Sequence, residues 1–484
     1  MEAAGKRDRH KVLILRCAEY DSGAISGIVR NGIELLGAKP SGKILVKPNT
    51  VLAHDEVFPH AFTRKEFLEG VLTAVRESGT AIEELAVGER SGITIPTRFN
   101  FKSAGYLDAI RKNQARAYYF DECRQVPLRL TTKGSLHKVI FVAKPVMDCD
   151  FFINLPKLKA HPWTRMTAAL KNLIGIQDDR HRLIDHNSFL EHKIADLQEA
   201  IPPGLIAVDA IVAGQKMMLT PTPFHLGAIV MGLNACAVDT VCSHMIHLNP
   251  QNLVHLRLAA ERGYGPCTLE EIEILGDFPL DEVREKTRGF EFCMERIDSY
   301  FAPSDNLSCT VGTFPEGCSS DYCWGGCPGA LQEAMHIFRG YYPEVDSKMK
   351  KIRYVVGQVE GPLDLEPDER VIFAGDCTAW EGFLDGSKVT IRSTYSRNVQ
   401  EEVTETKSND MLLKLADAMW HCFRKRSSRY IHVKGCPVSV AQHVSYLSSL
   451  GKIGNPNFDP RMVLPVTYAY WQMRAHRLWN RFFG

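Results

Sequence analysis

The sequence predicts an α/β protein made of two doubly wound, mostly parallel sheet domains. Short apolar runs of strand length recur along the chain, and between many of them lie longer segments with apolar residues at helical spacing. Strands that alternate with helices form parallel sheets with helices on both faces. The 484 residues also exceed what one hydrophobic core usually holds. We therefore expect two domains of the same class.

The N-terminal half contains the clearest alternation. Strands are predicted at residues 12–15, 43–46, 84–87, 151–155, 205–210 and 226–231, and helices at 22–36, 64–78 and 235–247. In the first of these helices Ile25, Val29 and Ile33 repeat every four residues, which places them on one face. We assign residues 1–268 to this first α/β domain.

The C-terminal half repeats the pattern after a polar segment at residues 269–308, which we expect to be a helical connection. Strands are predicted at 352–357, 371–374 and 430–433, and a helix at 328–338, where Pro328 suits the first turn. These elements predict a second α/β domain at residues 309–465. An aromatic and basic helix is expected at 466–484, and it can lie on an anionic membrane surface, dock on a partner or pack on its own domain.

Composition and charge argue against several classes of protein. Lysine and arginine number 58 against 57 for aspartate and glutamate, and a net charge of +1 argues against a nucleic-acid binder. The first ten residues lack an apolar signal core, and no apolar run approaches the roughly 18 residues of a membrane span. We therefore expect a cytoplasmic protein. In a reducing compartment the 14 cysteines indicate metal-binding, catalytic or buried thiols rather than disulfides.

Four cysteines are placed where a metal centre is expected. Cys323 and Cys327 are separated by three residues, whereas Cys377 and Cys436 each come just after a glycine that ends a predicted strand. Loops at the carboxyl ends of parallel strands meet at one edge of a sheet, so the four thiols can converge. Thiolates suit an iron–sulfur cluster or zinc, and zinc is less favoured because its structural ligands usually come as two close pairs. The alternative is four buried thiols that pack as small hydrophobic groups.

A second group of polar residues follows predicted strands in the N-terminal half. Lys47 and Asn49 come directly after the second strand, and a basic stretch follows the fourth. Cations at strand ends can bind an anion, assisted by the positive end of a helix that we expect to begin near Thr164. The alternative is a solvated basic surface, with Glu89 and Asp209 as helix caps.

These candidate residues divide into two roles. The groups with chemistry for proton transfer are His161, Lys171 and Lys47, and the imidazole is the best of them because its ordinary pKa is about 6.5. The candidate substrate-binding residues are Asn49, Lys157, Lys159, Thr164, Asn172, Glu89 and Asp209.

Five short motifs resemble one known family. They are Lys47-Pro48-Asn49, the stretch at 155–161, Leu170-Lys171-Asn172-Leu173 with Gly175, Val208-Asp209-Ala210 and Ala237-Val238-Asp239. Over about residues 10–265 the chain thus resembles the domain-of-unknown-function family 362. Many members of that family carry iron–sulfur ligands as closely spaced cysteines, but this chain has no Cys-x2-Cys-x2-Cys run. The resemblance implies the fold of the N-terminal half and leaves the reaction open.

The cysteine pattern of the C-terminal half resembles the cluster-bearing domain of hydrogenase small subunits. That resemblance implies a flavodoxin-like sheet and one 4Fe-4S cluster. Carried over by position, the ligands are Cys323, Cys327, Cys377 and Cys436, with Cys309 and Cys318 as reserve ligands. Two features depart from the pattern: three residues separate the first pair, and Val438 follows Cys436-Pro437 where a second proline is common.

Together these observations predict an iron–sulfur-dependent reductase that acts on an anionic small molecule. An electron-transfer or scaffold subunit for another enzyme is one alternative, and a non-redox enzyme with a structural cluster is another. The chain leaves open a redox partner protein, peripheral membrane contact through the C-terminal helix and a homodimer, whereas no nucleic acid is expected. Nucleotide use is not supported, because the chain lacks a Gly-x4-Gly-Lys-Ser/Thr phosphate loop and a Gly-x-Gly-x-x-Gly after its first strand. A flavin stays open, since flavin sites need no short motif.

Overall fold

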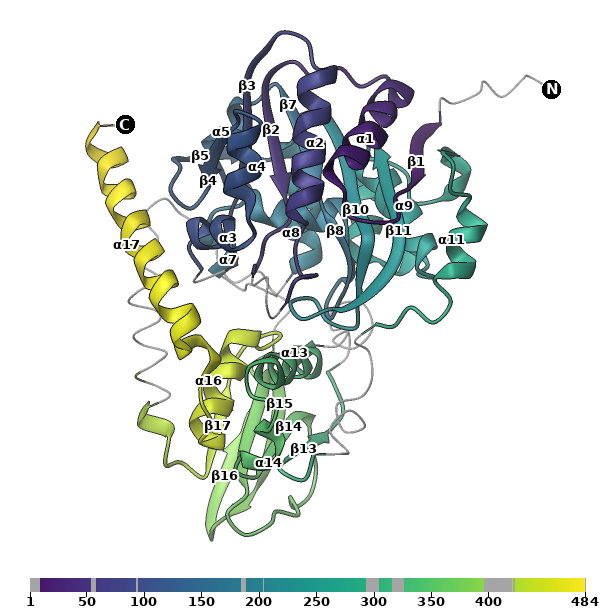
Figure 1. Ribbon diagram of the computed structural model, residues 1–484. Helices are drawn as coiled ribbons and strands as arrows, with labels where there is room; N and C mark the ends of the chain where they lie inside the picture. Colours follow the sequence, from purple (N-terminus) through teal and green to yellow (C-terminus); the bar gives the residue numbers. More distant parts are fainter. Residues whose placement is uncertain are drawn as a thin grey trace, which may run out of the picture. The chain divides into compact units, whose positions relative to one another are not determined.

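The computed structural model describes residues 9–53, 58–92, 95–183, 189–202, 204–292, 304–315, 326–395, 420 and 423–483. The chain forms two compact units, each with its own main sheet (Figure 1). Unit 1 comprises Met1–Arg182, Glu191–Glu291 and Val466–Gly484, and unit 2 comprises Leu183–Leu190 and Phe292–Pro465. The predicted α/β class, with a large, mostly parallel sheet and a second, smaller sheet, is confirmed.

The main sheet of unit 1 runs in the order β12-β1-β11-β10-β7-β2-β3-β4. Its strands are β1 (His10–Arg16), β2 (Gly42–Pro48), β3 (Ile82–Glu89), β4 (Arg116–Tyr119), β7 (Phe151–Leu155), β10 (Gly204–Gln215), β11 (Thr222–Gly232) and β12 (Ile272–Leu275). From β10 through β7, β2 and β3 to β4 the neighbouring strands are parallel. In contrast, β11 is antiparallel to both β10 and β1, because a short connection returns it directly beside β10.

The other elements of unit 1 surround this sheet. The helices are α1 (Ser22–Leu36), α2 (Lys65–Ser78), α3 (Thr97–Ser103), α4 (Tyr106–Lys112), α5 (Lys144–Asp148), α6 (Ala169–Asn172), α7 (Asp179–Leu183), α8 (Leu190–Asp196), α9 (Ala235–Met245), α10 (Val254–Glu261) and α11 (Leu280–Lys286). Two further strand pairs are β5 (Gln125–Arg129) with β6 (Val139–Ala143), and β8 (Lys157–His161) with β9 (Arg165–Thr167). The segment at 269–308, expected as a helical connection, thus gives β12 and α11 to unit 1.

Helices cover both faces of the main sheet. Met231 and Gly232 are neighbours on β11, so their side-chain positions point to opposite faces. A Cβ atom at Gly32 of α1 would lie 2.4 Å from the Met231 sulfur, whereas one at Gly232 would lie 2.7 Å from Val238 of α9. α1 and α9 therefore pack on opposite faces, and α2 lies beside α1 (Figure 1).

The segment after β8 differs from its prediction. The expected helix near Thr164 is wrong, because the chain turns there and continues as β9, which pairs antiparallel with β8. The His161 ring supports this turn, since its Nδ1 accepts hydrogen bonds from the backbone N–H groups of Trp163 and Thr164, each at 3.2 Å. The next helix, α6, begins at Ala169. The positive end of a helix is therefore not placed at Thr164.

Unit 2 has a smaller sheet of mixed direction. Its strands are β13 (Leu307–Val311), β14 (Ile352–Gln358), β15 (Arg370–Leu384), β16 (Ser387–Ile391) and β17 (Tyr430–Val433), and its helices include α13 (Gly326–Tyr341), α14 (Val345–Lys348) and α16 (Val440–Gly451). β13, β14, β15 and β17 are parallel, whereas β16 forms an antiparallel hairpin with the second half of β15. The three predicted strands of this half are present, whereas β13 and β16 were not predicted.

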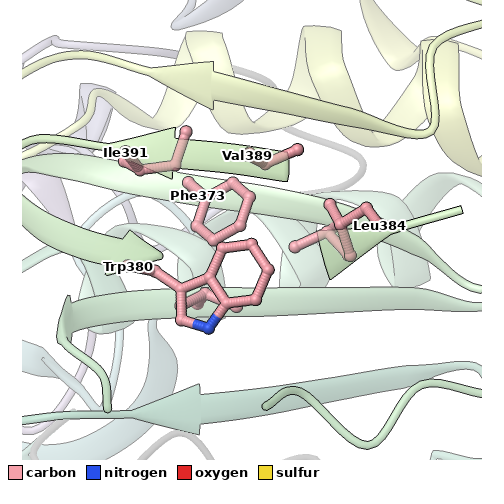
Figure 2. Close-up of a cluster of buried hydrophobic side chains, with 7 residues drawn as sticks. Phe373, Trp380, Leu384, Val389 and Ile391 are labelled. Atoms are coloured by element: carbon pink, nitrogen blue, oxygen red, sulfur yellow. The ribbon is translucent and has the colours of Figure 1, made fainter. Parts of the chain in front are cut away.

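A cluster of buried hydrophobic side chains lies where β15 changes partners (Figure 2). Its members are Val355, Val371, Phe373, Trp380, Leu384, Val389 and Ile391. The rings of Phe373 and Trp380 stack with centroids 5.4 Å apart. Phe373 lies on the part of β15 that pairs in parallel with β14 and β17, and Trp380 lies on the part that pairs with β16. The stack therefore fixes both ends of the segment between them, which includes Cys377.

The C-terminal helix α17 (Pro460–Phe483) includes the aromatic and basic helix that the sequence predicts. From Val466 onward it belongs to unit 1, where Arg477 Nε donates a hydrogen bond to the Asp121 carbonyl oxygen at 2.5 Å. In the part of the chain that is described, no helix combines the length and the hydrophobicity needed to cross a membrane.

Candidate functional site

A buried ion pair joins the carboxyl ends of β2 and β3 in unit 1. The Lys47 ammonium lies 2.7 Å from Glu89 Oε2 and donates a second hydrogen bond, also 2.7 Å long, to the Asn172 carbonyl oxygen. The side chains of Lys47 and Glu89 are 0% and 3% exposed. Burial lowers the pKa of Lys47 and raises the pKa of Glu89, and each partner opposes the shift of the other. Sequence reasoning placed both residues at strand ends, and the structure brings them into contact.

Gly175 lies directly against this pair. A Cβ atom at Gly175 would be 1.8 Å from Glu89 Oε1 and 2.8 Å from Lys47 Nζ. Only a glycine leaves room for the ion pair at this position. The glycine therefore has a steric role in the site, which the motif around residues 170–175 does not reveal by itself.

A chain of side-chain amides runs from β2 to the segment that carries Lys171. Asn49 Nδ2 donates to Asn172 Oδ1 at 3.1 Å, and Asn172 Nδ2 donates to Asn154 Oδ1 at 2.8 Å. The Asp239 carboxylate accepts hydrogen bonds from the first backbone N–H groups of α6, at Ala169 and Leu170. These contacts hold the short helix α6, and hence its lysine, against the strand ends.

Lys171 is presented at this edge without a hydrogen bond or an ion pair from any described residue. Its side chain is half-buried. Burial, followed by the nearby cations Arg182 and Lys47, lowers the pKa of Lys171 to about 8. An amine with a pKa in this range exchanges protons readily near neutral pH. This pKa suits Lys171 to proton transfer, and that role stays a prediction.

Lys157 and Asp209 form a second buried pair. Lys157 Nζ lies 3.0 Å from Asp209 Oδ2, and both side chains are fully shielded from water. Tyr20 completes the network, because its hydroxyl accepts from Lys157 at 2.6 Å and donates to Asp209 Oδ1 at 2.8 Å. Arg64 adds a backbone N–H to the same carboxylate. These contacts give both predicted binding residues partners inside the fold, which favours a role in holding β8 against β10.

The other predicted residues of the basic stretch lie in the β8–β9 hairpin. Lys159 Nζ donates to the Ala61 carbonyl oxygen at 2.5 Å, and the Thr164 hydroxyl donates to the Met166 carbonyl oxygen at 3.0 Å. Because His161 accepts hydrogen bonds at Nδ1, its neutral ring carries the proton on Nε2. Roles for these three residues in substrate binding or proton transfer stay predictions.

Two buried arginines at the same edge were missed by sequence reasoning. Arg90 follows Glu89 at the end of β3, and Arg182 lies on α7. Both guanidinium groups face Asp179: the Arg90 Nη1 to Asp179 Oδ2 distance is 3.1 Å, and the Arg182 Nη1 to Asp179 Oδ1 distance is 3.5 Å. The position of Arg90 directly after a predicted strand is a signal that could have identified it, whereas nothing local marks Arg182.

In unit 2 the described cysteines approach a glycine of β15. Cys327 lies in the first turn of α13 and is 4% exposed, and Cys377 on β15 is 6% exposed. A Cβ atom at Gly375, whose φ is +102°, would lie 3.0 Å from the Cys327 sulfur and 3.7 Å from the Cys377 sulfur. Two thiols from elements about fifty residues apart thus lie against one glycine.

The loop that carries Cys436 is bound to the same place. The Asp376 N–H donates to the Gly435 carbonyl oxygen, and the Gly435 N–H donates to Asp376 Oδ1, each at 3.0 Å. Two residues beyond Cys436, the Val438 N–H donates to the Cys327 sulfur at 3.3 Å. Three of the four predicted ligands are thus carried to one region by three elements.

The fourth predicted ligand, Cys323, lies outside the described residues, as does the reserve ligand Cys318. Cys309, the other reserve ligand, is half-buried on β13 and is paired in register with Tyr354 of β14. Among the residues that are described, no three ligating side chains already stand in the arrangement of a metal site. The thiols of Cys327 and Cys377 thus approach the same glycine, and the backbone next to Cys436 is bound to the same segment.

Comparisons with known proteins found a relative, similar solved structures and a family match. The chain is 27% identical over 290 residues to the thylakoid-associated protein sll1697 of Synechocystis sp., which covers 57% of this chain and 84% of that protein. A crystal structure of a protein from Thermotoga maritima is similar with a TM-score of 0.30 and 13% identity, over 49% of this chain and 61% of that chain. The lactate racemase apoprotein from Thermoanaerobacterium thermosaccharolyticum is similar with a TM-score of 0.31 and 12% identity, over 74% of this chain and 71% of that one. Residues 44–244, which contain the ion pair, the amide chain and Lys171, match the model of the family described as Domain of unknown function (DUF362).

Proposed function

We propose that this chain is an iron–sulfur-dependent reductase that acts on an anionic small molecule. The observation that carries the proposal is the approach of the Cys327 and Cys377 sulfurs to Gly375, with the Cys436 loop bound beside them. Cys327, Cys377, Cys436 and Cys323 would hold a cluster, and a bound cluster supplies storage and transfer of single electrons. The hydrogen bond from the Val438 N–H to the Cys327 sulfur favours a thiolate at that position.

Unit 1 supplies the groups for the substrate and for its protons. Lys171 gives a proton to the reduced substrate, because its ammonium is held at the strand ends with a pKa of about 8. The Lys47–Glu89 pair and the amide chain fix the backbone that presents Lys171. Electrons come from an external one-electron donor, for which a redox partner protein is the expected source.

The test is an anaerobic preparation of the full chain. We expect a brown protein with iron and sulfide in equal amounts, broad absorption at about 400 nm and a paramagnetic signal after reduction. Cys377→Ser should lose the iron, whereas Cys149→Ser, a half-buried thiol of unit 1, serves as the matched control and should keep it. A colourless, iron-free wild-type preparation would remove the basis of the proposal.

An electron-transfer or scaffold subunit is the second candidate, and the surface of α17 favours it. Large hydrophobic side chains are exposed along this helix, at Leu464, Tyr468, Trp471, Leu478 and Trp479. Four of them follow one another at intervals of four, three and seven residues, which places them along one face of the helix: Leu464, Tyr468, Trp471 and Leu478. The relative from Synechocystis is called thylakoid-associated, which supports attachment to a membrane or to a membrane-bound partner.

Replacement of Trp471 and Trp479 by serine separates the two candidates. If the chain works as a subunit, the double variant should lose association with anionic vesicles or with its partner while it keeps its fold and iron. If the chain is an enzyme by itself, its reductase activity with a chemical electron donor should be unchanged. Leu35→Ser, which removes an exposed hydrophobic side chain from α1, is the control.

A further inference from the structure

Several buried polar atoms at the ends of β2 and β3 lack a hydrogen-bond partner in the described part of the chain. The side-chain atoms are Thr50 Oγ1, Asn49 Oδ1, Arg90 Nε and Ser91 Oγ beside those strand ends, together with Arg182 Nε of α7 and Asp121 Oδ1 beyond β4. Buried polar groups are nearly always paired, because an unpaired one loses its hydration without a replacement. A group of such atoms at one sheet edge therefore indicates something that binds there.

Hydrogen bonds bring the segments that carry these atoms together. The Gly92 N–H donates to the Val51 carbonyl oxygen at 2.7 Å, which joins the turn after β3 to the turn after β2. Arg182 Nη2 donates to the Ser91 carbonyl oxygen at 2.8 Å. Ser91 and Thr50 thus lie beside the two ends of one backbone hydrogen bond, and Arg182 is anchored to the first of them.

The two guanidinium groups are fixed and already desolvated. Their side chains are 2% exposed for Arg90 and 6% exposed for Arg182. Arg90 Nη2 donates to the Phe120 carbonyl oxygen at 2.8 Å, and both arginines face the Asp179 carboxylate. These contacts use part of each guanidinium group and leave the N–H donors named above.

We propose that the turns after β2 and β3 form a subsite for the oxyanion of the substrate, a carboxylate or a phosphoryl group, held by Arg90 and Arg182. Guanidinium groups keep their charge and present paired N–H donors whose geometry matches such oxygens. The hydroxyls of Ser91 and Thr50 can donate to the same group. The identity of the occupant as the substrate rests on the proposed function.

The surrounding charges fit one oxyanion. Lys171 is close enough for Arg182 to lower its pKa, and an anion between them would offset that repulsion. Asp121 Oδ1 and Asn49 Oδ1 are acceptors, so they cannot bind the oxyanion itself. They suit a hydroxyl or another donor on the same molecule.

Direct binding of two simple probes tests this subsite. Inorganic phosphate and malonate are titrated into the full chain by calorimetry, and their relative affinity distinguishes a phosphoryl from a carboxylate site. Arg182→Lys keeps the charge but loses the fork of donors, and it should weaken the tighter probe at least tenfold. The matched control is Arg262→Lys, because the Arg262 side chain is 5% exposed and donates to Asp196 Oδ1 and to the Gly134 carbonyl oxygen at 2.6 Å each, and none of its atoms is among the buried atoms without a partner. The control should change the affinity less than twofold.

Ser91→Ala keeps the test decisive if Arg182→Lys does not fold. It removes only an unpartnered hydroxyl, and it should weaken the probe severalfold at an unchanged melting temperature. The subsite is disproved if neither probe binds the wild-type chain at millimolar concentration, as expected if only water occupies these atoms. It is equally disproved if Arg182→Lys and Arg262→Lys weaken binding alike, or if folded Ser91→Ala binds as tightly as the wild type.

The iron content of the same preparations separates this inference from the proposed function. Probe binding to an iron-free chain would support the subsite and contradict the reductase. An iron-containing chain that binds neither probe would contradict the subsite and leave the cluster supported.

Discussion

The Lys47 ammonium lies 2.7 Å from the Glu89 carboxylate at the ends of two adjacent parallel strands, where water reaches neither side chain. Such a pair is costly to bury, and it is retained only where its remaining hydrogen-bonding capacity is used. Here the Asn172 carbonyl oxygen accepts from Lys47, and the Arg90 N–H donates to Glu89. The pair therefore links the amide chain that holds Lys171 to the turn that carries Arg90.

Removal of one partner should destabilise the fold strongly. Lys47→Met leaves the Glu89 carboxylate buried without its cation, so we expect the free energy of unfolding to fall by about 3–5 kcal/mol. Addition of Glu89→Gln should recover part of this loss, because the uncompensated charge is gone. Denaturant unfolding of the two variants measures both effects. The control is Lys144→Met, which breaks an exposed pair with Asp148 and should lower the free energy of unfolding by less than about 1 kcal/mol. Equal losses of stability in Lys47→Met and Lys144→Met would contradict the argument.

Gly175→Ala should disturb the same pair by crowding. The new methyl group would lie 1.8 Å from Glu89 Oε1, so the carboxylate must move away from Lys47. We expect a loss of about 1–3 kcal/mol in the free energy of unfolding. Gly27→Ala is the matched control, because nothing lies within 4 Å of its added methyl and alanine favours the helix α1. In thermal unfolding we expect Gly175→Ala to lower the melting temperature and Gly27→Ala to raise it. An unchanged melting temperature for Gly175→Ala would show that the ion pair can shift without cost.

The strands at the centre of the main sheet could be predicted from sequence, but the direction of β11 could not. Apolar runs that alternate with helical segments predicted the parallel core from β7 to β3, and these strands are present. β11 has the same apolar character as the parallel strands of the sheet, yet it returns antiparallel beside β10. Its direction depends on the short connection after β10, which the hydrophobic pattern of either strand does not encode.

The site could be predicted only where residues lie at the carboxyl ends of strands. Lys47 and Glu89 do so, and the parallel register brings them together. By contrast, Asp209 accepts a hydrogen bond from Tyr20, which is 189 residues away in the chain, and no local sequence pattern connects the two residues. Thr164 was misassigned because a hydroxyl in a polar stretch is typical of helix starts, whereas here the His161 ring stabilises a strand turn instead.

The lowered pKa of Lys171 should appear in the pH dependence of stability. Below pH 8 its amine is charged in both the folded and the unfolded chain, so the folded state bears the full cost of burying the charge. Between about pH 8 and the ordinary lysine value of about 10.4, the folded chain has released this proton and the unfolded chain still binds it. Stability of the wild type should therefore rise with pH in this window relative to Lys171→Met. Denaturant unfolding between pH 7 and 10 measures the difference.

Lys144→Met is the control for this prediction, because its ammonium is exposed and paired with Asp148. Its stability should run parallel to that of the wild type across the whole window. If the Lys171→Met curve also runs parallel to the wild type, Lys171 titrates as an ordinary lysine and its role as the proton donor is unsupported.

Gly375→Ala should separate cluster binding from general stability in unit 2. The added methyl would lie 3.0 Å from the Cys327 sulfur and 3.7 Å from the Cys377 sulfur, so it would fill the space between the two thiols. Gly375 also has a φ of +102°, and a non-glycine residue in such a conformation costs about 1–2 kcal/mol. Gly386→Ala shares the positive φ, at +76°, but nothing lies within 4 Å of its added methyl. We therefore expect similar losses of stability from both substitutions, with a loss of iron from Gly375→Ala alone, measured by iron and sulfide analysis of anaerobic preparations. Equal iron content in the two variants would show that a cluster, if bound, does not depend on the space beside Gly375.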